Sequence, residues 1–212
     1  MTRAWTTATG LLTLLWAQKT FEGSITYTTK VEGAMAAQMG DMVKSQLPEK
    51  MTMFYRGNKV RTEVGDMVLI SDGDAGMVYL LNPALQTYQK APIRTPDEKD
   101  PQPKVVKTKD RTKILGHTVE RYLADLSTEQ GPIKMEIWAA PNFKVPEAAQ
   151  RSNSLTRGVK IEGIPLRIAM DVPGVDLKII FLATQLQTTL PDESLFQLPA
   201  GYIEEQTEAE QD

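Results

Sequence analysis

The chain has 212 residues, of which 41% are hydrophobic and 24% are charged, and its formal net charge is -3. These values are typical of a globular protein with one domain or a small pair, and no basic stripe with interleaved aromatic residues indicates nucleic-acid binding. The sequence contains no cysteine, which excludes disulfides, thiolate metal sites and a cysteine nucleophile.

Residues 1–17 are typical of a signal peptide. Arg3 supplies a short positive region, and residues 10–17 (GLLTLLWA) form an apolar core that is too short to span a bilayer. Cleavage after Ala17 would make Gln18 the first residue of the mature protein; the alternative is a buried N-terminal helix or strand. No later segment reaches the roughly 18 apolar residues of a membrane helix. We therefore expect an exported, periplasmic protein without a transmembrane segment, soluble once the signal peptide is removed.

The hydrophobic period changes early in the predicted mature chain. Residues 21–32 (FEGSITYTTKVE) alternate in the manner of a long, half-buried strand. In residues 34–47, by contrast, apolar side chains recur at steps of three and four, which predicts a helix that ends before Pro48. The apolar stripe of this helix consists of Met35, Met39, Met42, Val43 and Leu47.

Short antiparallel strands are expected from residue 51 onward, because apolar runs alternate with tight-turn pairs such as Gly57-Asn58. The first series covers residues 51–56, 59–64, 67–71, 77–81 and 85–89. Residues 91–110 contain four prolines among charged residues, which predicts a surface excursion rather than a domain boundary. The second series covers residues 113–116, 119–126, 133–139, 166–171 and 175–187.

Two helical turns and a tail complete the predicted domain. One turn is expected at residues 146–151, and Asp192 is placed to cap another that runs to Phe196. Residues 204–212 carry five acidic side chains and are expected to form a disordered tail. The prediction is therefore a single domain over residues 18–203.

Motifs for catalysis or metal binding are weak. The single histidine, His117, lies beside a predicted turn and has neither a second histidine nor a cysteine as a partner. Asp72-Gly73-Asp74 resembles the start of a calcium loop, but Pro83 occupies the position of the bidentate glutamate. We expect structural roles for both, and hence no metal, no cofactor and no enzymatic activity. A pair of carboxylates that meets only in space, as in glycosidases, is the remaining catalytic alternative.

The ten methionines of the chain suggest a different kind of site. The simplest interpretation is that they fill a core. Alternatively, a curved sheet and the methionine-striped helix enclose a cavity, since methionine is flexible and suits adaptable apolar surfaces. The residues expected to line that cavity and its lid are Met35, Met39, Met42, Val43, Leu47, Met53, Met135, Ile137, Met170 and Ile179.

Six short segments of the sequence resemble those of a known protein family. They are residues 21–27 (FEGSITY), 53–61 (MFYRGNKVR), 114–122 (ILGHTVERY), 136–138 (EIW), 163–166 (GIPL) and 195–202 (LFQLPAGY). In this order they resemble a family of exported bacterial domains of unknown function, which is similar to the LolA/LolB lipoprotein carriers. The resemblance covers roughly residues 20–203, although the cysteine usual in the family near residues 119–122 is absent. It implies a mostly β (α+β) fold: one curved antiparallel sheet that forms an unclosed β-barrel under a helical lid, with an apolar interior.

Three functions remain open at this point. The first is a periplasmic binding or carrier protein for a lipid, a lipoprotein acyl chain or another apolar ligand. The second is a cell-envelope protein–protein interaction module with a filled core and no ligand. The third, an enzyme with spatially assembled carboxylates, has the least support. A cavity of several hundred cubic ångströms under the helix would favour the first function.

Overall fold

The computed structural model describes residues 19–38, 47–93, 102–128, 131–151, 155–156 and 159–205. The predicted signal peptide, residues 39–46 of the predicted helix and residues 206–212 of the predicted tail lie outside these ranges.

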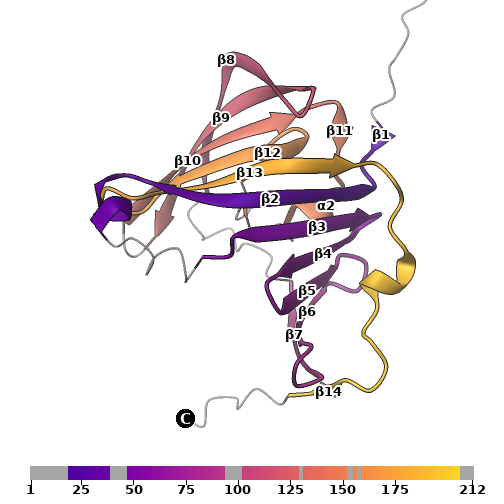
Figure 1. Ribbon diagram of the computed structural model, residues 1–212. Helices are drawn as coiled ribbons and strands as arrows, with labels where there is room; N and C mark the ends of the chain where they lie inside the picture. Colours follow the sequence, from indigo (N-terminus) through magenta and orange to yellow (C-terminus); the bar gives the residue numbers. More distant parts are fainter. Residues whose placement is uncertain are drawn as a thin grey trace, which may run out of the picture.

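One curved sheet of twelve strands makes up most of the fold (Figure 1). Its order is β14-β7-β6-β5-β4-β3-β2-β13-β12-β10-β9-β8, and within the described residues its two end strands are not paired with each other. Neighbouring strands run antiparallel except for the β14–β7 pair. The strands are β2 (Gly23–Glu32), β3 (Lys50–Arg56), β4 (Lys59–Val64), β5 (Met67–Asp72), β6 (Met77–Asn82), β7 (Thr87–Pro92), β8 (Lys104–Ile114), β9 (His117–Thr128), β10 (Gly131–Ala140), β12 (Ile164–Asp171), β13 (Lys178–Gln187) and β14 (Ile203–Glu204). The prediction of a mostly β fold with an unclosed sheet is confirmed.

Smaller elements lie around this sheet. The short parallel pair β1 (Lys19–Thr20) and β11 (Phe143–Lys144) forms a separate two-stranded sheet. The helix α2 (Glu147–Arg151) and the 3-10 helix η1 (Glu193–Phe196) are the two predicted helical turns, and Asp192 caps η1 through the backbone N–H of Ser194. Residues 34–38 are helical, which agrees with the start of the predicted lid helix.

Two predicted strand boundaries are wrong for local reasons. Leu85 was expected in a strand, but its backbone N–H donates to Asn82 Oδ1 and Gln86 has a φ of 52°, so a turn delays β7 until Thr87. The last predicted strand was expected to start at Val175. Leu177 donates to the backbone carbonyl of Val175 in a turn instead, and β13 begins at Lys178.

The predicted surface excursion over residues 91–110 is wrong at both ends. β7 extends to Pro92, and β8 begins at Lys104 and pairs with β9 from Asp125 back to His117. The loop was predicted from four prolines among charged residues, but the prolines precede β8. The charged residues fit a strand here because β8 is an end strand of the sheet, and charged side chains are common on sheet edges. Residues 94–101 lie outside the described ranges.

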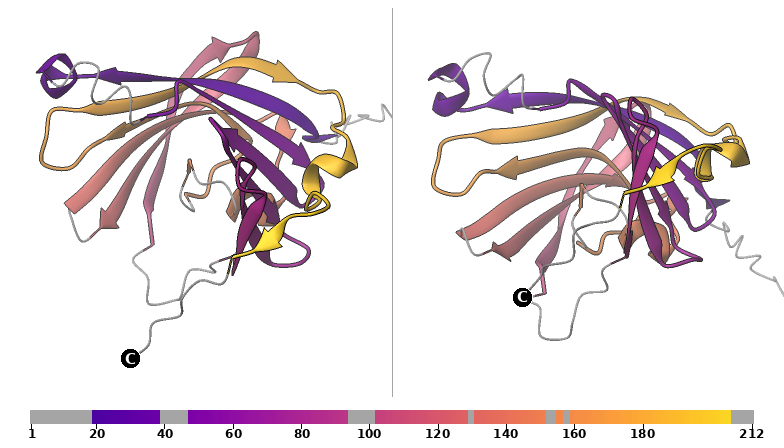
Figure 2. Two further views of the ribbon diagram at one scale, coloured as in Figure 1. Left: turned by 60° about the horizontal axis from the view of Figure 1, so that its bottom comes forward. Right: turned by 90° about the horizontal axis from the view of Figure 1, so that it is seen from below.

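The concave face of the sheet is closely packed at one end. There α2 and the segment that follows it lie inside the curve of the sheet (Figures 1 and 2). Tyr27 is fully buried and donates from its hydroxyl to the carbonyl of Pro165 across β13 at 2.7 Å. The space between Tyr55 and the residues after α2 measures only about 10 Å³, about the minimum that a single water molecule needs. The buried apolar side chains supplied by the α2 region are Val145, Ala149, Leu155, Val159 and Ile161.

The C-terminal segment covers part of the convex face. Val68, Ile70 and Leu81 form a second buried cluster there, against which Tyr202 packs. Arg61 Nη1 donates to the carbonyl of Leu195 at 2.9 Å and thereby holds η1 on the sheet. Glu204, which was expected in the disordered tail, pairs with β7 as part of β14, and Glu205 accepts a bond from Thr87.

Arg61→Ala should lower the free energy of unfolding by about 1–3 kcal/mol, because the 15% exposed arginine side chain makes charge-assisted bonds to Leu195 and Glu63. Lys90→Ala is the matched control, since its pair with Glu204 is solvent-exposed and should contribute little to stability. Urea denaturation measures both variants. Equal losses in the two would show that Arg61 does not anchor the C-terminal segment.

Candidate functional site: an apolar row and its pocket

One row of apolar side chains crosses six strands on the concave face. The row is defined by direct cross-strand pairs, so its members share one face of the sheet and touch their neighbours. We call it the apolar row. Its members, from β2 to β8, are Val31, Ile179, Met170, Met135, Ala124 and Val105.

Burial differs along and beside the apolar row. Met135 and Ala124 are each 2% exposed, whereas Val31, Ile179, Met170 and Val105 are only half-buried. The next row toward α2 contains Ile168 and Ile137, both fully buried. The apolar row therefore marks the transition from the packed end of the concave face to an end where apolar surface is still accessible.

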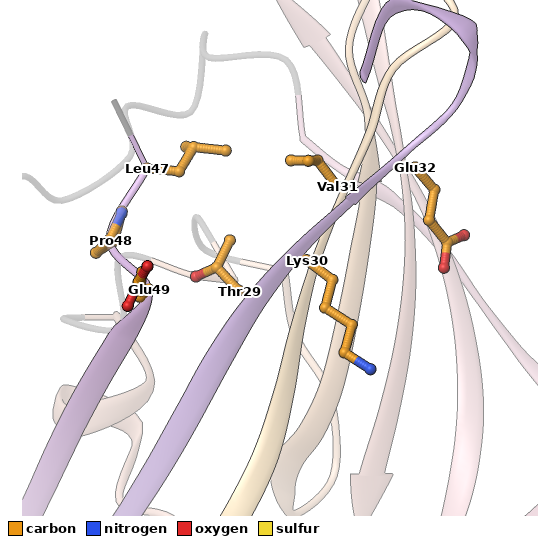
Figure 3. Close-up of a pocket in the computed structure, with 7 residues that line it drawn as sticks. All are labelled: Thr29, Lys30, Val31, Glu32, Leu47, Pro48 and Glu49. Atoms are coloured by element: carbon orange, nitrogen blue, oxygen red, sulfur yellow. The ribbon is translucent and has the colours of Figure 1, made fainter. Parts of the chain in front are cut away.

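A pocket of about 420 Å³ opens at the β2 end of the apolar row. In Figure 3, Val31 and Leu47 point toward one another across it, while Lys30 and Glu32 point away. The pocket exists because β2 is longer than its neighbour: pairing with β3 ends at Thr28 and Lys50, with one further bond from Thr29 N–H to the Glu49 carbonyl. Its volume lies within the range typical of ligand pockets. The residues that line it are Thr29, Lys30, Val31, Glu32, Leu47, Pro48 and Glu49.

The short helical segment beside this pocket is fixed at its first residues. Asp176, from the turn between β12 and β13, accepts from Ala34 N–H through its carboxylate and from Met35 N–H through its carbonyl. Gly33 is required there, since it has a φ of 109° and a Cβ would lie 2.3 Å from the Asp176 carbonyl oxygen. The helix start is thus tied to the strands that carry Ile179 and Met170.

The predicted site residues fall into three groups: those near the apolar row and its pocket, one in the packed core, and those outside the described residues. Met135, Ile137, Met170 and Ile179 lie in or next to the apolar row, Leu47 lines the pocket, and Met35 is half-buried on the helical segment. Met53 is placed differently: it is fully buried, its sulfur accepts from the Tyr55 hydroxyl, and it belongs to the packed core. Met39, Met42 and Val43 lie outside the described residues.

Three members of the apolar row were not predicted as site residues: Val31, Ala124 and Val105. Val31 continues the alternation of Ile25, Tyr27 and Thr29, so its face could have been read from the same strand pattern. Val105 lies in the segment that was predicted to be a loop, so no strand face was assigned to it.

A charged cluster lies beside the β8 end of the apolar row. Glu120, whose side chain is 8% exposed, lies 2.7 Å from Lys107 Nζ and accepts a 2.7 Å bond from Arg111. Lys107 also pairs with Glu162 at 2.8 Å and lies over the Tyr122 ring. The hydrogen bond from Lys107 lowers the pKa of Glu120 from its ordinary value near 4.5, and the same bond raises the pKa of Lys107.

Glu120→Gln should remove a pH-dependent part of the stability. Because the folded pKa of Glu120 is depressed, its contribution is present above pH 4.5 and is lost as the pH falls through the folded pKa. The variant should lose about 1–3 kcal/mol at neutral pH. As the pH is lowered, the free energy of unfolding of the variant should fall by less than that of the native protein. Urea unfolding across this pH range measures the difference, and parallel curves would contradict the assignment.

The residues considered for metal binding have structural roles. The His117 ring packs against Phe143 with a centroid distance of 5.1 Å. Asp72 accepts the backbone N–H groups of Asp74 and Ala75 and pairs with Lys59, as expected of a hairpin turn. In the part of the chain that the structure describes, no three acidic or histidine side chains form a metal-binding group. No helix of this part combines the length and hydropathy needed to traverse a bilayer.

No family model and no curated protein matches this sequence. One similar solved structure is described as PNGF-II in the P21 space group, with a TM-score of 0.47 and 13% identity; the match covers 86% of this chain but only 31% of that chain. Another is a Vibrio parahaemolyticus domain assigned as an outer membrane lipoprotein-sorting protein, with a TM-score of 0.33, 12% identity, and coverage of 84% and 92%. Similarity at this level does not show a family, so the functional argument rests on the geometry of the site.

Proposed function

We propose that this protein is a binding or carrier protein for a lipid, an acyl chain or a similar elongated apolar ligand. The observation that supports this best is that the apolar row, four of whose six members are half-buried, leads to the 420 Å³ pocket at its β2 end. A row of aliphatic side chains at strand spacing offers a long, narrow apolar surface, which suits a chain better than a compact molecule.

The contrast between the two ends of the concave face supports the same proposal. The space beside α2, between Tyr55 and Val159, measures only about 10 Å³, so that end is packed like a conventional core. At the other end the apolar side chains keep part of their surface accessible, although burying it would be favourable by about 25 cal/mol per Å². A bound apolar chain would supply that burial.

The location of the protein is part of the proposal. Residues 1–17 have the charge and apolar pattern of a signal peptide, so we place the mature protein in the periplasm. There an apolar chain that leaves a membrane needs a protein to shield it from water, because each exposed CH2 group costs about 0.8 kcal/mol.

Titration of delipidated protein with a naturally fluorescent fatty acid tests the proposal. We expect saturable binding with an emission change, displacement by unlabelled fatty acid, and lipid in organic extracts of the protein before delipidation. Delipidated protein that leaves the fluorescence unchanged over the whole titration would refute the carrier function. The chain would then be better described as an interaction module with a filled core.

A further inference from the structure

The edge strand β8 concentrates positive charge in a chain whose net charge is -3. It contains five basic residues and one acidic residue in eleven positions. β8 is the last strand in the sheet order and lies at the free edge (Figures 1 and 2). These five basic residues therefore lie together along one free edge of the sheet.

Three of these basic side chains are not used by the fold. Lys107 and Arg111 are committed to the cluster around Glu120. Lys104, Lys109 and Lys113 are exposed, and among the described residues they form no ion pair. We call these three side chains the lysine edge. Lys104 lies opposite Asp125 in the β9 register without forming an ion pair with it, and the three lysines together give accessible positive charge along the edge.

Exposed aliphatic side chains accompany the lysine edge. Val106 on β8 is 52% exposed and pairs directly with Leu123 on β9, which is 40% exposed. Leu115, in the turn between the two strands, is 42% exposed. Lysines beside aliphatic side chains match the surface of an anionic bilayer, where the charges meet headgroups and the apolar groups enter the interface. Nucleic-acid binding typically adds aromatic or arginine contacts to bases; β8 contains no aromatic residue, and its one arginine, Arg111, pairs with Glu120.

The lysine edge also lies next to the proposed ligand path. Val105, which follows Lys104, is the β8 end of the apolar row. A membrane that contacted this edge would therefore lie beside one end of the apolar surface.

We propose that the lysine edge docks on an anionic lipid bilayer. This inference rests on the proposed function, because a carrier for an apolar chain needs contact with the membrane that supplies or receives it. Docking through β8 would place Val105, the β8 end of the apolar row, next to the lipid tails and keep the 420 Å³ pocket at the far, β2 end of the row.

Vesicle co-sedimentation of the mature protein tests the docking. We expect binding to vesicles that contain phosphatidylglycerol, much weaker binding to phosphatidylcholine alone, and a loss at high salt, because screening shortens the range of the interaction. The combined variant Lys104→Gln, Lys109→Gln and Lys113→Gln should bind about a hundredfold more weakly, given about fivefold per lysine at an anionic surface. The control combines Lys134→Gln, Lys144→Gln and Lys160→Gln, three other exposed lysines, and should bind like the native protein.

The outcomes separate this inference from the proposed function. Native binding by the lysine-edge variant, or an equal loss in the control, would overturn the docking surface. Binding to heparin but not to phosphatidylglycerol vesicles would overturn the membrane as the partner. The fluorescent fatty acid titration in solution should be unchanged by the lysine-edge variant. Loss of vesicle binding together with normal fatty acid binding is the result that supports the docking and keeps the carrier function.

Discussion

Ile168→Ala should lower the free energy of unfolding by about 2–5 kcal/mol, whereas Met170→Ala, two residues further along β12, should lower it by only about 1–2 kcal/mol. Both side chains lie on the concave face, but Ile168 is fully buried and Met170 is half-buried. Truncating Ile168 leaves a cavity in the packed end, while Met170 borders accessible space. The difference between the two losses of unfolding free energy therefore shows where along β12 the packed core ends.

For ligand affinity the order of the two truncations should be reversed, with the larger effect in Met170→Ala. Met170→Ala removes contact surface from the apolar row and should weaken fatty acid binding, while Ile168→Ala should leave it close to native wherever the variant is folded. Chemical denaturation and fluorescence titration on the same preparations give both quantities. Equal destabilisation by the two truncations would show that the concave face is packed uniformly and that no open end exists.

Ile179→Asp should abolish binding of an apolar chain while the fold is retained. Ile179 is the half-buried member of the apolar row on β13, between Val31 and Met170. A carboxylate at this point must lose its hydration when an acyl chain covers it, at a cost of about 3 kcal/mol or more, so affinity should fall at least about a hundredfold.

A matched control places the same charge away from the site. Leu85 is 66% exposed in the turn before β7, and Leu85→Asp should change neither affinity nor stability measurably. Ile179→Leu keeps the apolar character and should bind within a few-fold of the native protein. Circular dichroism and urea unfolding establish that the Asp variant is folded. Undiminished binding by folded Ile179→Asp would remove the apolar row from the ligand path.

The strand pattern was predictable where alternation is strong, and less so at turns and edges. β2 to β6 follow the sequence closely because apolar and polar residues alternate between defined turn pairs. Only the last residues of β8 were predicted, because an edge strand needs little burial and tolerates charged residues of the kind found in loops. The start of β7 depended on the Asn82 turn bond, which strand periodicity does not reveal.

The candidate site was only partly predictable for a related reason. Periodicity shows which face of a strand is apolar, and the alternation over residues 166–171 places Met170 on the same face of β12 as Ile168. It does not show how far a packed core extends along that face. Met53 and Met170 look alike in sequence, yet one is fully buried beside Tyr55 and the other is half-buried in the apolar row. That difference is set by α2 and the segment after it, which fill one end only.

Methyl NMR with labelled methionine tests the central claim most directly, because methionines lie in both regions of the concave face. On addition of a spin-labelled fatty acid, the methyl signal of Met170 in the apolar row should broaden strongly, and that of Met135 should follow. The signals of Met51 and Met53, 4% and 0% exposed in the packed core, should be unaffected. Broadening of all methionine signals alike, or of none, would contradict an apolar-chain site on the apolar row.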